Sequence, residues 1–104
     1  MTQFNRLTSA QHERLAVLSE ELGEAQQAIG KILRHGYDCW NPDKETENEY
    51  PPDNRADLER ELGDVVYAMN LLLDSGDVHS DAIVKRTLLK AAKIKPYLHH
   101  QDTP

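Results

Sequence analysis

The sequence predicts an all-α protein, an antiparallel helical bundle that is completed by oligomerisation. In three segments the apolar residues recur at alternating spacings of three and four, which is the periodicity of amphipathic helices. No segment alternates apolar and polar residues with a period of two, so no β-strand is expected. The 104 residues suffice for a single domain, 1–104. At this size folding buries only about 60–70% of the unfolded surface, which favours association of several copies.

The first helix is expected over about residues 9–35. Thr8, followed three residues later by Gln11, can form a capping box at its start. Gly36 is a common signal for a helix end. The apolar seam of this helix consists of Leu15, Leu18, Leu22, Ala25, Ile29 and Ile32.

Two further helices are expected over about residues 55–74 and 80–95. The first of them should start after Asp53 and Asn54 and stop at the segment 74–77, Asp-Ser-Gly-Asp. Its seam consists of Leu58, Leu62, Val65, Met69 and Leu72. The last helix carries Ile83, Val84, Leu88, Ala91 and Ile94, and Pro96 should kink or end it, with one further turn following.

Residues 36–54 interrupt every periodicity and are expected to form a long loop. Prolines, asparagines and acidic residues dominate this segment, and long loops in small domains are often functional. A surface excursion without function is the alternative, but Tyr37, Trp40 and Tyr50 are costly side chains to leave in water.

Composition restricts the class of protein. The formal net charge of −6 argues against a nucleic-acid partner, because such binding depends on cationic contacts to phosphate. Cys39 is the single cysteine, which excludes an internal disulfide and fits a reducing compartment. No apolar run approaches the roughly 18 residues of a membrane span, and the N-terminus has no basic and apolar leader. We therefore expect a soluble, cytoplasmic protein without a membrane partner.

One helical pattern occurs twice, at an offset of 40 residues: LSEELGEAQQAI (18–29) aligns with LERELGDVVYAM (58–69). Duplication of one helix and chance are both open as origins. Each copy contains two carboxylates three residues apart, Glu21 with Glu24 and Glu61 with Asp64. On a helical wheel the first acid of each copy lies roughly 70° from the seam and the second roughly 130°, on the same side in both helices.

Antiparallel packing of the two seams would bring the four carboxylates together at one edge of the helix pair. Carboxylates that converge repel one another, but oxygen ligands suit a hard cation such as Mg²⁺. The alternative is that the four acids form an ordinary solvent-exposed surface and bind no cation. A di-iron site is disfavoured, because its helical motif has histidine where this chain has Glu24 or Asp64. Gly23 and Gly63 fall on the opposite flank and are expected to allow another helix to approach closely.

These residues resemble the EExxE…ExxD signature of the MazG family, the all-α nucleoside triphosphate pyrophosphohydrolases. The signature is present as Glu20-Glu21-Leu22-Gly23-Glu24 and Glu61-Leu62-Gly63-Asp64. The similarity extends over residues 12–101, including KILRHG (31–36) and YLHHQ (97–101), and is greatest to small single-domain members from bacteriophages and bacteria. The 36 residues between Glu24 and Glu61 exceed the usual gap, so base-recognition elements are not carried over.

The resemblance implies a MazG-like bundle that hydrolyses nucleoside triphosphates to monophosphate and pyrophosphate. It implies Mg²⁺ as cofactor, for which Mn²⁺ can substitute, and the ligands Glu21, Glu24, Glu61 and Asp64. Glu20 and Glu21 are the candidate catalytic residues, and Glu20 would hold a second metal or orient the water. A homodimer or tetramer with sites near subunit interfaces is also implied, in a bacterial or phage-infected cell. There the activity would remodel or clean the nucleotide pool, with dGTP or GTP as the guessed substrates.

Basic and aromatic side chains are the candidates for binding the substrate. Lys31 and His35 lie on the acidic flank of the first helix, and Lys90 and Lys93 are the favoured pair in the basic third helix. Trp40 is expected to stack on the base if the loop closes over the nucleotide; otherwise the loop is a spacer.

Two alternatives to an enzyme remain. One is a non-catalytic helical module of the same fold that binds nucleotides or proteins, and the other is a structural bundle that only self-associates.

Overall fold

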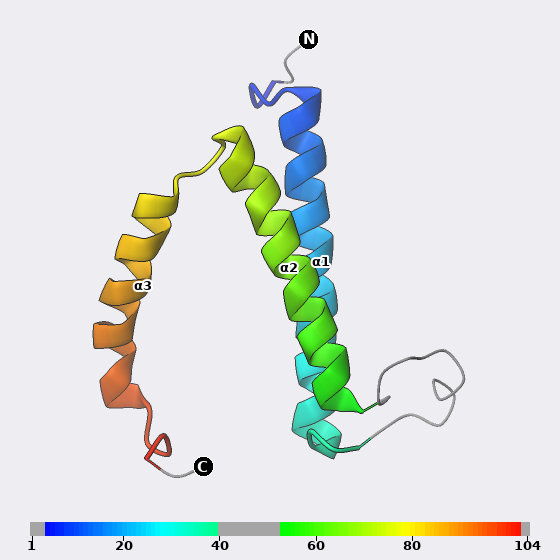
Figure 1. Ribbon diagram of the computed structural model, residues 1–104, viewed down its shortest axis with the longest axis vertical. Helices are drawn as coiled ribbons and strands as arrows, with labels where there is room; N and C mark the ends of the chain where they lie inside the picture. Colours follow the sequence, from blue (N-terminus) through cyan, green and yellow to red (C-terminus); the bar gives the residue numbers. More distant parts are fainter. Residues whose placement is uncertain (1–3, 40–52, 103–104) are drawn as a thin grey trace.

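The computed structural model describes residues 4–39 and 53–102, and this part of the chain is helical (Figure 1). Helix α1 spans Ser9–His35, α2 spans Asn54–Ser75 and α3 spans Ser80–Ile94. A 3₁₀ turn, η2, follows over Lys95–Tyr97. The all-α class and the three expected helices are confirmed, each to within one residue of the expected bounds. None of the helices described is long and apolar enough to cross a membrane.

The helix ends follow from local capping chemistry. Thr8 and Gln11 form the expected capping box, with each side chain accepting a hydrogen bond from the other residue's backbone N–H. Asp53 caps α2 by accepting from the N–H of Ala56. Helices α1 and α2 end at Gly36 and Gly76, whose φ angles of 86° and 82° favour glycine over any residue with a side chain.

Helices α1 and α2 pack against each other as an antiparallel hairpin (Figure 1). The apolar residues buried between them are mostly small: Ala25, Ala28, Ala68 and Leu72. Ala25 and Leu72 belong to the two expected apolar seams, so the seams take part in the contact, and Ala28 and Ala68 beside them are buried as well. Leu22, Ile29 and Leu62 of the same seams remain about half exposed.

Helix α3 runs apart from the α1–α2 pair (Figure 1) and buries no residue. Its apolar side chains stay in contact with solvent, including Leu88, which is 69% exposed. The radius of gyration is 17.5 Å, compared with about 13 Å for a compact domain of this length. The chain alone therefore does not form the closed bundle that the apolar periodicity of α3 would allow.

The two ends of the long loop are joined next to the hairpin. The backbone N–H groups of Asn54 and Arg55 donate to the carbonyl oxygens of Cys39 and Tyr37, at N–O distances of 2.9 and 3.0 Å. The guanidinium of Arg55 also lies 5.0 Å from the centre of the Tyr37 ring and pairs with Asp38. These contacts hold the end of α1 beside the start of α2.

At the other end of the hairpin, an ion pair joins α1 to the turn after α2. Arg14 donates from Nε to Asp77 Oδ2 at 2.7 Å and from Nη2 to Asp77 Oδ1 at 3.2 Å, and both side chains are largely shielded from solvent. The hydrogen bonds from Arg14 lower the pKa of Asp77. A carboxyl with a lowered pKa stabilises the fold above its unfolded-state pKa and loses that contribution as the pH falls through its folded-state pKa.

Asp77→Asn is therefore expected to lower the melting temperature at pH 7. The difference from the wild type should shrink as the pH falls below about 3.9, the ordinary pKa of aspartic acid, because protonation then removes the same charge. Thermal unfolding followed by circular dichroism at a series of pH values checks this. A difference that is the same at pH 7 and at pH 3 would contradict the ion-pair explanation.

Candidate metal centre

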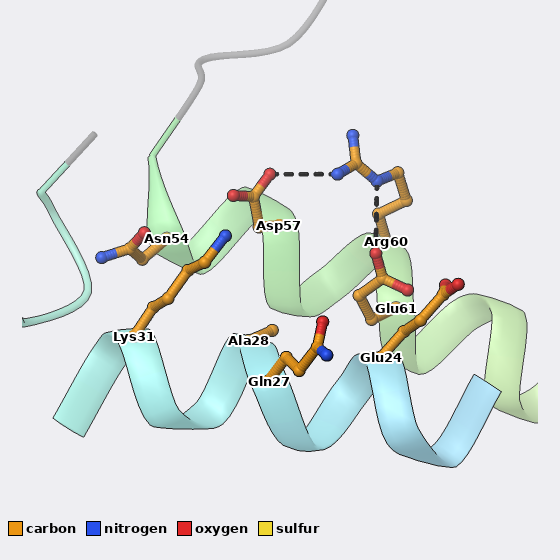
Figure 2. Close-up of a pocket in the computed structure, with 8 residues that line it drawn as sticks. All are labelled: Glu24, Gln27, Ala28, Lys31, Asn54, Asp57, Arg60 and Glu61. Carbon is orange, nitrogen blue, oxygen red and sulfur yellow. Dashed lines mark hydrogen bonds and ion pairs between the residues drawn. The ribbon is translucent and has the colours of Figure 1, made fainter. Parts of the chain in front are cut away.

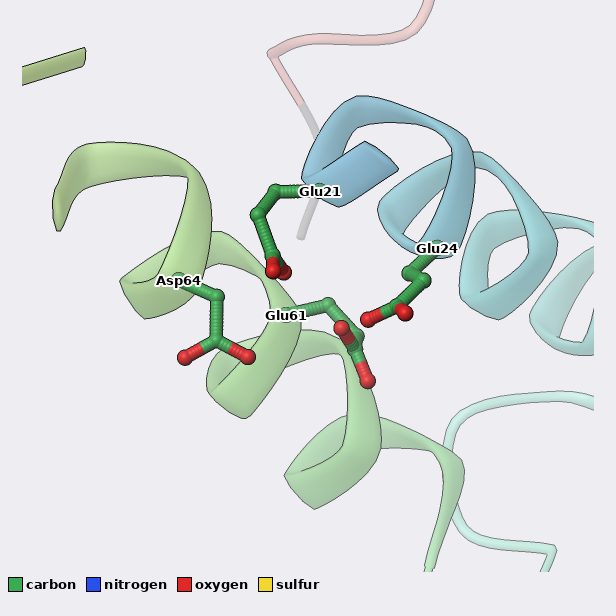
Figure 3. A group of neighbouring side chains, drawn as sticks. All are labelled: Glu21, Glu24, Glu61 and Asp64. Atoms are coloured by element: carbon green, nitrogen blue, oxygen red, sulfur yellow. The ribbon is translucent and has the colours of Figure 1, made fainter. Parts of the chain in front are cut away.

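Four acidic side chains from the two packed helices converge at one edge of the hairpin. Helix α1 contributes Glu21 and Glu24, and α2 contributes Glu61 and Asp64. Each offers one carboxylate oxygen, and these oxygens all lie within 4.8 Å of one another. Figure 3 shows the carboxylates pointing into a shared space between the helices. The structure thus brings together the four residues that the wheel geometry predicted would converge, within a single chain.

Two of these carboxylates each have one buried oxygen without a hydrogen-bond partner among the described residues. Oε2 of Glu21 and Oε2 of Glu61 are shielded from solvent, and neither accepts a hydrogen bond from the residues that the structure describes. A buried polar oxygen without a partner costs roughly 1–3 kcal/mol, and more when it carries charge. A cation bound between the helices would supply the missing partner for both oxygens. Glu24 is half-buried and Asp64 is exposed, so the cluster is also open to solvent on one side.

The electrostatics of the cluster favour a positive charge. Burial raises the pKa of Glu21, and repulsion from Glu24 and Asp64 raises it further. Burial is also the main cause of the raised pKa of Glu61, followed by its interaction with Glu24. Among the described residues, one ion pair reaches the cluster, between Arg60 Nε and Glu61 Oε1 at 3.9 Å. This pair is too long and too exposed to offset four converging acids.

The donor set fits a hard divalent cation. All four groups offer oxygen, no sulfur or imidazole ligand among the described residues belongs to the cluster, and the side open to solvent leaves room for water or a phosphate oxygen. Mg²⁺ in phosphate-handling sites usually takes one or two carboxylates together with waters and substrate phosphates, and the four acids supply more than enough oxygen ligands for that. Glu21, Glu24, Glu61 and Asp64 would hold it here.

The raised pKa values predict how the stability of the metal-free protein depends on pH. Glu21 and Glu61 bind protons more tightly in the folded state than in the unfolded state, so folding is opposed once they ionise. The metal-free protein should lose stability as the pH rises from about 4.3, the ordinary glutamate value, through the raised folded-state pKa values. Added Mg²⁺ should restore the melting temperature at pH 7 and have little effect near pH 4. Melting curves with EDTA and with Mg²⁺ measure both effects; an equal response to Mg²⁺ at the two pH values would contradict the prediction.

The two repeated glycines lie away from the cluster and face open space. A Cβ atom built on Gly23 or Gly63 would meet no other atom within 4 Å. No helix in the described part of this chain therefore makes the close approach that was expected at these positions.

The other predicted site residues differ in where they lie relative to the four-acid cluster. Glu20 is exposed and is not part of the four-acid cluster. Lys31 lines a recess beside the cluster, whereas His35 is exposed at the end of α1 and does not line it. Lys90 and Lys93 are exposed on α3, away from the acids of the same chain. Trp40 lies outside the described residues, so the expected stacking on a base stays a prediction.

Several residues of the recess were not recognised from the sequence. Figure 2 shows Gln27 on α1 and Asn54, Asp57 and Arg60 on α2 around the same space as Lys31. Asn54 was interpreted only as a helix-start residue. The sequence contained one signal for these residues: Asp57 and Arg60 are three apart and stand one turn before the ExxD motif. That spacing indicates an ion pair on one face of a helix, but it does not indicate that α1 forms the opposite wall of a recess.

Comparison of the chain with protein-family models, with curated proteins and with solved structures found no match in any of the three.

Proposed function

We propose that this chain is a Mg²⁺-dependent nucleoside triphosphate pyrophosphohydrolase of the MazG-like type. The observation that carries the proposal is the convergence of four carboxylates, two from each helix, with two buried oxygens that have no partner among the described residues. A bound cation would relieve the repulsion within this cluster, which supports a function that uses the cation. The resemblance of residues 20–24 and 61–64 to the EExxE…ExxD signature supplies the reaction.

The residues of the chain would bind the cation and hold it against the phosphates. When bound, Mg²⁺ supplies charge neutralisation at the phosphate oxygens and activates a water for attack on the α-phosphorus, with pyrophosphate as the leaving group. Glu21 and Glu61 bind from the buried side of the cluster, while Glu24 and exposed Asp64 complete the ligand set at its edge. Glu20, exposed beside Glu21, is free to accept a proton from the attacking water or to orient it.

The same proposal includes assembly into a dimer or tetramer. Apolar side chains on all three helices remain exposed, among them Leu33 at 81% and Leu88 at 69%. Exposed apolar surface of this kind marks an interaction site. A second copy covering the seam of the α1–α2 pair with its α3 would also bring Lys90 and Lys93 within reach of the acids. This is how the basic residues of α3 would bind phosphates that they do not approach within one chain.

Release of pyrophosphate from a panel of the common nucleoside and deoxynucleoside triphosphates, dGTP and GTP included, tests the proposed function. Each substrate is assayed with Mg²⁺, with Mn²⁺ and with EDTA. If the chain is the proposed enzyme, pyrophosphate and monophosphate should form in equal amounts, and only when the metal is present. Metal-dependent nucleotide binding without turnover would instead indicate a non-catalytic module. No effect of metal and nucleotide on the melting temperature would indicate a structural bundle.

A further inference from the structure

A recess of about 310 Å³ lies between α1 and α2, directly beside the acidic cluster. It shares Glu24 and Glu61 with the cluster and extends from them toward the loop end of the hairpin (Figure 2). Its lining residues are Glu24, Gln27, Ala28, Lys31, Asn54, Asp57, Arg60 and Glu61. A group bound at the Glu24 and Glu61 end of the recess would lie next to a cation held by the four carboxylates.

The lining is polar and charged, which favours one part of a nucleotide over the others. Of the eight described side chains that surround the recess, Ala28 is apolar and none is aromatic. These described residues offer a base no ring on which to stack, although stacking is the usual way that bases are held. The lining suits a strongly hydrated, charged group instead.

A bound metal ion would make the recess less negative. Lys31 and Arg60 face three carboxylates, those of Glu24, Asp57 and Glu61, so the recess has a slight negative excess in the metal-free state. Glu24 and Glu61 are also members of the proposed metal site. One divalent cation held by the four acids would offset part of their negative charge, so an anion in the recess would meet less repulsion and be attracted by the cation, Lys31 and Arg60.

Arg60 is in position to respond to this change. Its Nη2 donates to Asp57 Oδ1 at 3.2 Å, and its Nε lies 3.9 Å from Glu61 Oε1, both longer than the about 2.7–2.9 Å of a good charge-assisted hydrogen bond. A cation that takes the oxygens of Glu61 competes with the longer of these contacts. The guanidinium then has donors available for a phosphate, which it matches in a bidentate geometry.

Lys31 forms the opposite wall. It projects from α1 across the recess toward the first turn of α2 (Figure 2), and it has no ion-pair partner among the described residues. Its ammonium group and the amide of Gln27 are further donors on the α1 side of the recess.

We propose that this recess binds the pyrophosphate portion of the substrate once the metal is in place. Arg60 on α2 and Lys31 on α1 then form charge-assisted hydrogen bonds to its phosphate oxygens from opposite sides. The inference rests on the proposed function for the identity of the substrate and deepens it by assigning the leaving group to one side of the metal. Arg60 is then the residue that couples the two sites, since it exchanges Glu61 for a phosphate oxygen.

Binding of pyrophosphate itself, without any turnover, tests the inference. Isothermal titration calorimetry measures the Kd of pyrophosphate in the presence of saturating Mn²⁺ for the wild type, Arg60→Gln, Arg60→Lys and Lys31→Gln. Arg34→Gln is the matched control, because it removes an equal charge from an exposed position on α1 that does not line the recess. Circular dichroism confirms that each variant folds, and Mn²⁺ binding without pyrophosphate is measured separately.

Arg60→Gln and Lys31→Gln are expected to weaken pyrophosphate binding roughly tenfold or more, while Arg34→Gln changes it little. Arg60→Lys should recover part of the affinity. Mn²⁺ binding alone should be unchanged or tighter in Arg60→Gln, because a competing cation is removed. Wild-type-like Kd values in both recess variants, or absence of pyrophosphate binding by the wild type, would overturn the inference.

The outcome is separable from that of the proposed function. If the wild type binds metal pyrophosphate through Arg60 and Lys31 but cleaves no nucleotide, the recess assignment holds and the enzyme proposal fails. If the wild type cleaves nucleotides and its inhibition by pyrophosphate is the same in both recess variants, the enzyme proposal holds and the recess assignment fails.

Discussion

Replacing Glu61 with glutamine is expected to remove most of the pyrophosphohydrolase activity, with a loss of roughly 100-fold or more in kcat. Glu61 has a buried oxygen that lacks a partner among the described residues, and it belongs both to the four-acid cluster and to the recess. Glutamine keeps the shape of the side chain but provides no charge for the cation. The loss should therefore come from weaker metal binding and less stabilisation of the phosphates, not from a damaged fold.

The same variant should be at least as stable as the wild type when the metal is removed. Burial, followed by the interaction with Glu24, raises the pKa of Glu61, and a neutral side chain at this position carries no charge to be buried or repelled. Glu59→Gln is the matched control: it lies two residues away on α2, is exposed and is not part of the cluster. Steady-state assays of pyrophosphate release and melting curves in EDTA measure the two effects. Full activity in Glu61→Gln, or equal losses in both variants, would remove Glu61 from the metal site.

Introducing leucine at Gly23 and Gly63 together is expected to break the assembly into smaller species. Within one chain these positions are open, since an added Cβ meets no atom within 4 Å. In a chain that stays monomeric the substitutions should therefore stabilise α1 and α2, because leucine is favoured over glycine in a helix by somewhat less than 1 kcal/mol per site. If a second copy packs closely against the glycine flanks, the larger side chains block it.

The solution mass distinguishes the two cases. Light scattering at micromolar concentration should give a dimer or tetramer for the wild type and a smaller species for the double leucine variant. Gly23→Ala with Gly63→Ala is the graded control, because alanine favours the helix while adding only one carbon atom. A wild-type mass of one chain would contradict the proposed oligomer. An unchanged mass in the leucine variant would show that the glycine flanks are not the contact.

The helices and the grouping of the acids were predictable because both depend on local rules. The bounds of α1 follow from the capping box of Thr8 with Gln11 and from Gly36, whatever the rest of the chain does. The convergence of Glu21, Glu24, Glu61 and Asp64 follows from one periodicity occurring in two antiparallel helices. The angle between an acidic side chain and the apolar seam of its own helix does not depend on distant residues.

Only the tertiary structure decided how α1 and α2 are rotated against each other. Ala25 of the first seam is buried together with Ala28 and Ala68 beside the seams, and in this packing oxygens of Glu21 and Glu61 are buried while Leu22 stays half exposed. The same rotation creates the recess that contains Arg60, and it was not visible in either helix alone. The sequence determined which residues form each face of each helix. The choice of the face that is buried depended on side-chain volumes across the interface, and a periodicity does not contain that information.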